Sequence, residues 1–599
     1  MKTKKIKAFL GACALALAVP AFAATADDAH AAREARALAA LAERYHEAQL
    51  RFDPVYSGTL NGDNRYDDLL PATIAPGQRR ARFAMYRDVK RQLGAIDRAA
   101  LPEADALTWD VLAHELDGRL AAGRFDDHLL PLQQMDAIPL LLATFAGGQA
   151  DQPLKTVAQH EAFLKRLAAL PAWDEQAVEN MREGMRRGIV QPRPVVVAVL
   201  AQLGPMCSAR VEDNPFLAPV RGATAGFAQA DRARLDAAYR ATVLGRVAPA
   251  MCRLRDFVER EYLPAARSSV GWSALPDGAA WYRQWVRDQT TTALGPDEIH
   301  AMGLAEVARI QGELARVAPR LGYTGDPAQL LSWVRGNPAF LPFRDADLVV
   351  GAYHGIDSEV RAQLPTLFHR LPRAALDIRL EPELTRATAS DHYSPPAQDG
   401  SRPGVFWAVV NDPAIYDSSI MTALFLHEGE PGHHLQMALQ QELPLPAFRK
   451  SAWINAYGEG WALYAESLGR ELGLYDDPGA YVGYLRQDIF RAARLVVDTG
   501  LHAKGWSREH AIAYLKETTG LTDAQCASQV DRYLAWPAQA LGYKLGALRI
   551  LALRERARQA LGDRFDLAAF HDLVLGEGPL PLALLEARVE RWIERQRGR

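Results

Sequence analysis

The chain has 599 residues, of which 49% are hydrophobic and 24% charged, and its formal net charge at pH 7 is −3. This composition is ordinary for a folded soluble protein, and it excludes a disordered chain and a small disulfide-rich domain. A mildly acidic chain has no electrostatic attraction to phosphates, so we expect no nucleic-acid partner.

The first 23 residues have the pattern of a cleavable secretory signal peptide. Four lysines precede an apolar run over 8–19, and the small-x-small sequence Ala21-Phe22-Ala23 follows this run. Cleavage after Ala23 would leave 576 residues with a net charge of −7, because the leader carries four lysines and no acidic residue. We therefore expect a periplasmic or secreted protein.

Two other modes of membrane attachment are less favoured. Leu10-Gly11-Ala12-Cys13 is similar to a lipoprotein cleavage box, but the apolar run before Cys13 is short for such a signal. Beyond the leader, no stretch reaches the roughly 18 uninterrupted apolar residues that a membrane-spanning helix needs. We expect no stable membrane span.

Three cysteines remain outside the leader: Cys207, Cys252 and Cys526. An odd number cannot form a complete disulfide framework. Cys207 and Cys252 could pair in an exported protein, but three buried free thiols is the slightly favoured prediction.

Most of the remaining chain shows apolar residues at three-to-four spacing, which predicts a mainly α-helical protein. Pro296-Asp297-Glu298 is typical of a helix start, and Ser507 is a predicted N-cap. The predicted helices cover 29–51, 154–170, 229–264, 296–319, 461–473, 480–504 and 508–519.

Two short strands are expected. Residues 405–410 form an apolar run between Gly404 and Asn411-Asp412-Pro413, and apolar and charged residues alternate over 376–380. The Pro-, Gly- and Ser-rich segment 391–404 is predicted to be a loop. We expect the strand at 405–410 to be the sheet edge that binds a peptide in extended form.

The domain boundary is only weakly marked. The Gly271–Gly278 segment is a plausible break, and the predicted division is an N-terminal helical region over 24–290, forming a cleft wall, and a catalytic region over 291–599. The sequence does not predict an oligomeric state.

Metal-binding chemistry is concentrated in residues 420–440, IMTALFLHEGEPGHHLQMALQ. His427 and Glu428 begin the His-Glu-x-x-His pattern of zinc hydrolases, but Pro431 replaces the second histidine. On a regular helix the next histidines, His433 and His434, would not reach the same ion, because position i+6 lies about 240° around the axis. Pro431-Gly432 predicts a helix break that could return one of them to the ion. A kinked structural helix is the less favoured alternative.

A third ligand is expected in residues 456–468, AYGEGWALYAESL. Glu459 lies between two glycines, where backbones can approach closely, and it shares a helix face with Glu466. Glu459 is the predicted ligand, and Glu466 is either a carboxylate that orients a ligand histidine or an ordinary surface residue. Zn²⁺ is the expected ion.

Several segments resemble the bacterial family labelled only as domain of unknown function 885. They are RDQTTTALGPDEIHAMGLAEVARI (287–310), HEGEPGHHLQ (427–436), EGWALYAE (459–466), VVDTGLHAKGW (496–506) and YLAWPAQALGYKLG (533–546). The resemblance covers most of the mature chain. It implies a large helical zinc-peptidase fold with a deep cleft and a small β-sheet beside the metal-binding helix, similar to helical oligopeptidases and carboxypeptidases.

The resemblance also implies roles for single residues. Glu459 matches the metal-binding glutamate in the Glu-Gly-Phe-Ala-x-Tyr-x-Glu pattern of aminopeptidase N relatives. Dipeptidyl peptidase III shows that a longer His-Glu…His spacing can hold zinc. Gly432-His433 is similar to the Gly-His pair of the thimet oligopeptidase and thermostable carboxypeptidase families, so His433 is favoured over His434 as second ligand.

The remaining machinery is predicted less specifically. Residues 538–543 resemble the Ala-Gln-x-x-Gly-Tyr segment of thimet oligopeptidase relatives, which implies that Tyr543, or secondly Tyr533, donates to the developing oxyanion. His502 shares a helix face with Asp498 and could donate to a tetrahedral intermediate, or the two could form an ordinary buried pair. Three cations could bind a substrate carboxylate or form structural ion pairs: Arg494, Arg532 and Lys544.

Together these features predict an exported zinc peptidase. His427, His433 and Glu459 would hold the ion, and Glu428 would be the general base in the hydrolysis of short peptides. The alternatives are a binding or scaffolding protein that lost catalysis and a zinc hydrolase of non-peptide amides.

Overall fold

The computed structural model describes residues 26–148, 151–223, 226–386, 389–397, 400 and 402–598. The predicted signal peptide, its cleavage site after Ala23 and the lipoprotein-like Cys13 lie outside these residues. The described part is mainly α-helical and contains a three-stranded sheet, as the periodicity of the sequence predicts.

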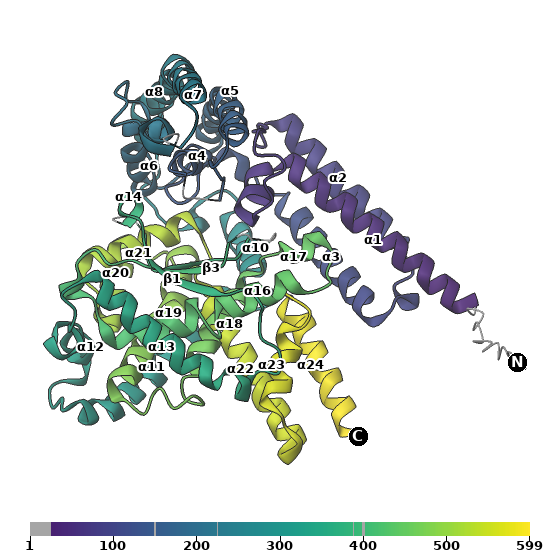
Figure 1. Cartoon of the computed structure of the whole chain (residues 1–599), viewed down its shortest axis with the longest axis vertical. Helices are drawn as coiled ribbons and strands as arrows, with labels where there is room; N and C mark the ends of the chain where they lie inside the picture. Colours follow the sequence, from purple (N-terminus) through teal and green to yellow (C-terminus); the bar gives the residue numbers. More distant parts are fainter. Residues whose placement is uncertain are drawn as a thin grey trace, which may run out of the picture.

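The N-terminal half forms two groups of helices (Figure 1). The first three helices pack on one another and extend to one side of the molecule, and the group from α4 to α8 lies beyond the sheet. Their bounds are α1 (Ala26–Phe52), α2 (Pro76–Gly94), α3 (Glu103–Ala122), α4 (Ile138–Ala146), α5 (Val157–Arg187), α6 (Arg193–Met206), α7 (Gln229–Thr242), α8 (Ala248–Phe257), α9 (Leu263–Ala265) and α10 (Gly278–Thr290).

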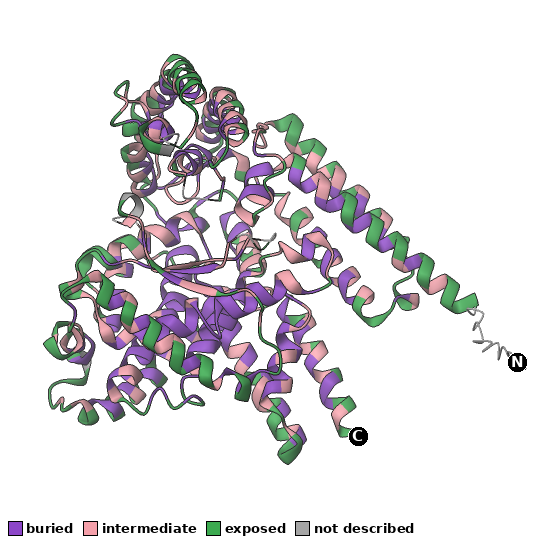
Figure 2. Ribbon diagram, viewed as in Figure 1, coloured by how far each residue is buried: buried purple, intermediate pink, exposed green. Residues whose placement is uncertain are grey.

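The C-terminal half surrounds the sheet and contains the most buried helices (Figure 2). Its bounds are α11 (Pro296–Val317), α12 (Leu330–Gly336), α13 (Ala346–Leu367), α14 (Glu383–Arg386), α15 (Met421–Glu428), α16 (His433–Glu442), α17 (Ala447–Lys450), α18 (Asn455–Ser467), α19 (Pro478–Ala503), α20 (Arg508–Thr519), α21 (Asp523–Ala535), α22 (Leu541–Leu561), α23 (Leu567–Leu575) and α24 (Leu582–Arg597).

The predicted helix starts are confirmed. α11 begins at Pro296, and the Ser507 hydroxyl accepts a hydrogen bond from the His510 amide at the start of α20. The segment predicted as one helix over 229–264 is α7, α8 and α9, joined by π-helical turns at Val243–Val247 and Val258–Tyr262. No helix among the described residues is long and apolar enough to cross a membrane.

The sheet corrects two predictions about strands. Its order is β1 (Leu376–Leu380), β3 (Gly404–Ala408) and β2 (His392–Ser394), with β1 parallel and β2 antiparallel to β3. β3 therefore has hydrogen-bonded neighbours on both sides and is not the peptide-binding edge. β2 lies inside the segment predicted as a loop, because its three residues are too few to stand out from the surrounding prolines and glycines.

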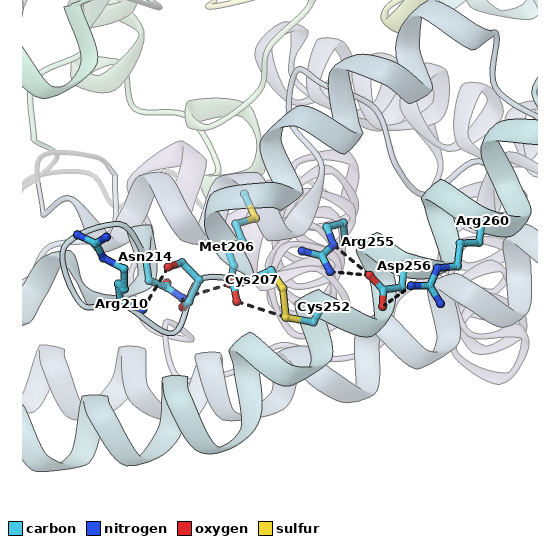
Figure 3. The surroundings of a disulfide bond; sticks show 9 residues. Met206, Cys207, Arg210, Asn214, Cys252, Arg255, Asp256 and Arg260 are labelled. Atoms are coloured by element: carbon cyan, nitrogen blue, oxygen red, sulfur yellow. Dashed lines mark hydrogen bonds and ion pairs between the residues drawn. A yellow bond between two sulfur atoms is a disulfide. The ribbon is translucent and has the colours of Figure 1, made fainter.

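The cysteine prediction is also corrected. Cys207 and Cys252 form a disulfide, and Cys526 is free and buried (Figure 3). Cys207 directly follows α6 and Cys252 lies on α8, and packing of these two helices brings the Cα atoms to 4.8 Å, within the range of a disulfide. The slightly favoured prediction of three free thiols is wrong, because the sequence does not show which helices pack together.

Close packing of α18 against α22 fixes the centre of the molecule. A Cβ at Gly460 would clash with the backbone of Gly546 on α22, so the two helices meet at a pair of glycines. Trp461 on the next position is fully buried. Glu459 is therefore carried by a helix that packs closely against α22.

Apolar contacts cross the predicted domain boundary at 290. One buried cluster joins Phe125, Trp272 and Trp281 from the N-terminal region to Leu495 and Leu545 from the C-terminal region. The division into 24–290 and 291–599 stays a prediction.

Candidate metal centre

The expected helix break lies directly after the His-Glu pair. α15 ends at Glu428, α16 begins at His433, and a cis peptide joins Glu430 to Pro431 between them. A Cβ at Gly432 would clash with the carbonyl oxygen of His427, so this tight return of the chain requires glycine. The predicted irregularity at Pro431-Gly432 is confirmed.

The break brings three side chains together. The Glu459 Oε2 atom lies 3.6 Å from His427 Nε2 and 3.4 Å from His433 Nε2. One potential ligand atom from each residue lies within 4.8 Å of the others. Metal–ligand bonds near 2.1 Å place the ligand atoms of a tetrahedral zinc site about 3.4 Å apart, so the spacing suits one ion.

The donor atoms also fit a cation chemically. Glu459 Oε2 is buried and accepts no hydrogen bond from the described residues. A buried carboxylate oxygen without a partner is costly, and a bound cation would satisfy it. Two imidazoles and one carboxylate form a ligand set typical of catalytic zinc.

The ionisable groups of the centre are strongly coupled. Burial lowers the pKa of His427, but Glu459 and Glu466 outweigh this effect and raise it to about 9. Burial raises the pKa of Glu459, but His427 and His433 bring it well below its usual range. The opposite shifts describe a carboxylate held between two imidazoles.

Glu466 orients His427. Its Oε1 atom accepts a hydrogen bond of 2.8 Å from His427 Nδ1, which leaves Nε2 directed at Glu459. A carboxylate behind a ligand histidine is a common arrangement in zinc sites. Glu466 is fully buried and lies 3.8 Å from the Arg491 guanidinium, so the surface-residue alternative is wrong.

His434 points away from the centre. Its Nδ1 atom lies 3.0 Å from the Tyr393 hydroxyl, and Nε2 donates to the Ala374 carbonyl at 3.1 Å. Burial lowers the pKa of His434 to about 4. The structure thus brings His433, and not His434, to His427 and Glu459.

Glu428 lies beside the centre with its carboxylate available. It is only partly buried and makes no hydrogen bond or ion pair with a described residue. Burial raises the pKa of Asp391 to about 6, and the nearby charge of Glu428 adds to this shift. Asp391, which accepts hydrogen bonds from Val409 N and Tyr416 Oη, was not predicted, because no spacing in the sequence connects it to the motif.

Tyr543 borders His427. The two rings are nearly parallel, at 14°, with centroids 6.3 Å apart. The Tyr543 hydroxyl accepts a weak hydrogen bond of 3.4 Å from Gln539. The Tyr533 hydroxyl instead accepts from Arg494 Nε at 3.2 Å, so Tyr543 is the tyrosine better placed for a role at the centre.

Both ring nitrogens of His502 have backbone partners, which leaves neither of them free for the predicted catalytic role. Its Nδ1 atom accepts from the Trp272 amide at 3.2 Å, and Nε2 donates to the Tyr533 carbonyl at 3.0 Å. Asp498 is bonded to Tyr282 Oη and Ala538 N instead of His502. A shared helix face does not reveal that other groups, the Tyr282 hydroxyl and three backbone groups, occupy the two side chains.

Lys544 is also structural. Its ammonium group forms ion pairs with Asp488 and, at 3.0 Å, with Glu306. Of the three cations predicted to bind a substrate carboxylate or to form structural ion pairs, Lys544 therefore forms structural ion pairs.

Two surface hollows lie elsewhere on the molecule. One, of about 790 Å³, includes residues of α6 and the start of α20, and the other, of about 580 Å³, lies between α5 and α8. Neither includes a residue of the histidine–glutamate centre. The deep cleft over this centre stays a prediction.

The fold and centre define a mainly helical protein with a buried histidine–glutamate cluster suited to a metal ion. A family model described as "Bacterial protein of unknown function (DUF885)" matches residues 53–589, and the chain belongs to this family. The resemblance stated from the sequence motifs is confirmed. No curated protein matches the sequence.

Solved structures support the fold. A candidate lipoprotein from Colwellia psychrerythraea is 29% identical, with a TM-score of 0.87 over 94% of this chain and 100% of its own. A candidate lipoprotein of unknown function from Shewanella oneidensis is 18% identical, with a TM-score of 0.72 over 92% of this chain and 99% of its own. A candidate oligoendopeptidase F from Bacillus anthracis has a TM-score of 0.28, which is too low to support an argument.

Proposed function

We propose that this protein is an exported zinc-dependent peptidase that hydrolyses short peptides. The observation that carries the proposal is the cluster of His427, His433 and Glu459. In this cluster the buried Oε2 atom of Glu459 accepts no hydrogen bond from a described residue. Glu428, the residue next to His427, supplies a free carboxylate beside them. Metal ligands and a general base are the two requirements of metal-assisted hydrolysis.

The three ligand residues would hold the ion. Zinc bound there would lower the pKa of a water molecule towards neutrality and polarise a substrate carbonyl. Glu466 keeps the imidazole of His427 in the tautomer whose Nε2 faces the ion. The Arg491 guanidinium, 3.8 Å from Glu466 Oε1, places a positive charge near this carboxylate.

Glu428 would transfer the proton. It takes a proton from the attacking water and returns it to the amine that leaves. The hydroxyl of Tyr543, next to His427, is the proposed donor to the oxygen that becomes negatively charged. Because His502 is occupied by backbone groups, it has no part in this scheme.

Export belongs to the proposal. The leader pattern favours a soluble periplasmic or secreted product, and the Cys207–Cys252 disulfide suits an oxidising compartment. The two structural relatives are described as candidate lipoproteins, which makes lipid attachment at Cys13 the competing outcome. The intact mass of the exported product distinguishes an N-terminus at Ala24 from a lipidated Cys13.

Replacement of Glu428 by Gln tests the catalytic part. The variant keeps the size and shape of the side chain but removes the base, so we expect cleavage of an unblocked peptide mixture to fall by at least about 100-fold with zinc retained. Mass spectrometry of the products would follow the reaction. Equal activity of Glu428→Gln and parent would contradict the proposal, and cleavage of non-peptide amides alone would favour the alternative of a zinc hydrolase of such amides.

A further inference from the structure

Two arginines near the metal centre lack a carboxylate partner. Arg494 on α19 is 5% exposed and donates from Nε to Tyr533 Oη and from Nη2 to Gln529 Oε1, both at 3.2 Å. Arg532 on α21 donates from Nη2 to Gln539 at 3.2 Å, and its buried Nε has no hydrogen-bond acceptor. Within the described part of the chain, neither guanidinium has an Asp or Glu oxygen within the 4.0 Å of an ion pair.

Neighbouring arginines, unlike Arg494 and Arg532, have a carboxylate partner. On the same helix, Arg486 forms an ion pair with Asp417, and Arg491 lies 3.8 Å from Glu466. A buried positive charge is costly unless an anion accompanies it. The buried guanidinium of Arg494, together with the half-buried one of Arg532, therefore points to an anion supplied by a bound molecule.

Arg494 lies next to the tyrosine that borders the metal centre, and Arg532 is connected to the same tyrosine through Gln539. The guanidinium carbon of Arg494 is 4.8 Å from the centroid of the Tyr543 ring, and that ring stacks on His427. Gln539, which accepts from Arg532, donates to the Tyr543 hydroxyl. Since a residue spans about 3.5 Å, the contacts of 4.8 Å and 6.3 Å keep an anion at Arg494 within about three residues of a peptide bond at the metal centre.

We propose that Arg494 and Arg532 bind the C-terminal carboxylate of the substrate, so that the protein removes residues from the C-terminus of short peptides. This inference rests on the proposed peptidase function and specifies its substrates. Guanidinium groups are suited to such recognition because their parallel N–H groups match the two oxygens of a carboxylate. In the reaction, water adds to the last peptide carbonyl, the C–N bond breaks, and the released amine takes the proton.

The same chemistry could recognise an acidic side chain. Three N-blocked peptides that differ only at the C-terminus separate the sources: the free acid, its amide, and an amide whose last residue is Glu. We expect kcat/KM for the free acid to exceed that of the neutral amide by about 10- to 100-fold. Equal cleavage of acid and neutral amide, or faster cleavage of the Glu-ending amide than of the acid, would overturn the proposal.

Variants assign the preference to the arginines. Arg494→Gln should lower the ratio of kcat/KM for the free acid to kcat/KM for the amide by about 10- to 100-fold with zinc retained, and Arg494→Lys should keep part of this preference. Arg508→Gln is the matched control, because Arg508 already has a carboxylate partner in Asp531. An equal loss on acid and amide in Arg494→Gln would contradict a role in carboxylate binding.

A binding experiment separates this inference from the catalytic one. Calorimetric titration of the zinc-loaded parent and of Arg494→Gln would compare an N-acylated amino acid with its amide. Arginine-dependent preference for the acid without any peptide cleavage would support the carboxylate site and contradict the peptidase. Glu428-dependent cleavage without a preference for the acid, in rate or binding, would do the reverse. If the protein shows no cleavage and no preference for the acid in binding, both proposals are contradicted.

Discussion

At the scale of single residues, His433 and His434 have opposite surroundings although they are adjacent in sequence. His433 Nε2 faces Glu459. In His434, by contrast, Nδ1 is hydrogen-bonded to the Tyr393 hydroxyl and Nε2 to the Ala374 carbonyl. The motif could not separate the two by spacing, because the chain between Glu428 and His433 is not helical. Resemblance to other Gly-His pairs favoured the residue that the structure brings to the centre.

Substitution of the two histidines tests this difference. His433→Ala should weaken zinc binding by more than about 100-fold, since loss of a residue that only hydrogen-bonds to a ligand already lowers metal affinity by about 10- to 100-fold. His434→Ala should keep the zinc affinity but lower the free energy of unfolding by about 1–3 kcal/mol, because it leaves buried polar groups without partners. Competition with a chelator and chemical unfolding would measure the two effects. Loss of zinc in His434→Ala but not in His433→Ala would contradict the assignment.

At the scale of elements, the sequence predicts helices well and their packing poorly. Amphipathic periodicity and capping residues act locally, so α1, α11, α19 and α20 are recovered close to their observed ends. β2, the central position of β3 and the contact of α6 with α8 depend on residues distant in sequence. Asp498 shows the same limit, since its partners belong to α10 and to the segment before α22.

Asp498 should make stability depend on pH. Burial raises the pKa of its carboxyl group to about 7, above the value of about 3.9 in an unfolded chain. The folded state then binds the proton more tightly, so this contribution is complete below pH 4 and is lost as the pH rises to 7. Asp498→Asn should flatten the fall of unfolding free energy between pH 4 and pH 7, measured by urea unfolding. An unchanged profile would contradict the shifted pKa.

The disulfide between α6 and α8 should stabilise the N-terminal half. It closes a loop with a sequence separation of 45, for which loop entropy gives about 4 kcal/mol. The Cys207→Ser/Cys252→Ser protein should unfold at lower denaturant concentration than the parent, and reductant should shift the parent but not the variant. Thiol titration of the unfolded mature parent should find Cys526 alone. Three titratable thiols would show that the bond does not form.

At the scale of the whole molecule, the candidate metal centre occupies a small part of a large helical fold. The centre combines α15, α16 and α18, and packing of α18 on α22 places Tyr543 beside it. The family and the mainly helical architecture follow from the sequence, because motifs and periodicity persist along the chain. The proposed carboxylate site does not follow from the sequence, because it depends on how α19 and α21 present Arg494 and Arg532.

The most direct test of the central claim is the zinc content of the purified protein. Elemental analysis after dialysis against trace zinc should find about one ion per chain in the parent and in Glu428→Gln, as expected for a site with three protein ligands. Glu459→Ala should bind almost none, because it removes the carboxylate between His427 and His433. A parent that binds no zinc, or a Glu459→Ala protein that retains it, would contradict the account.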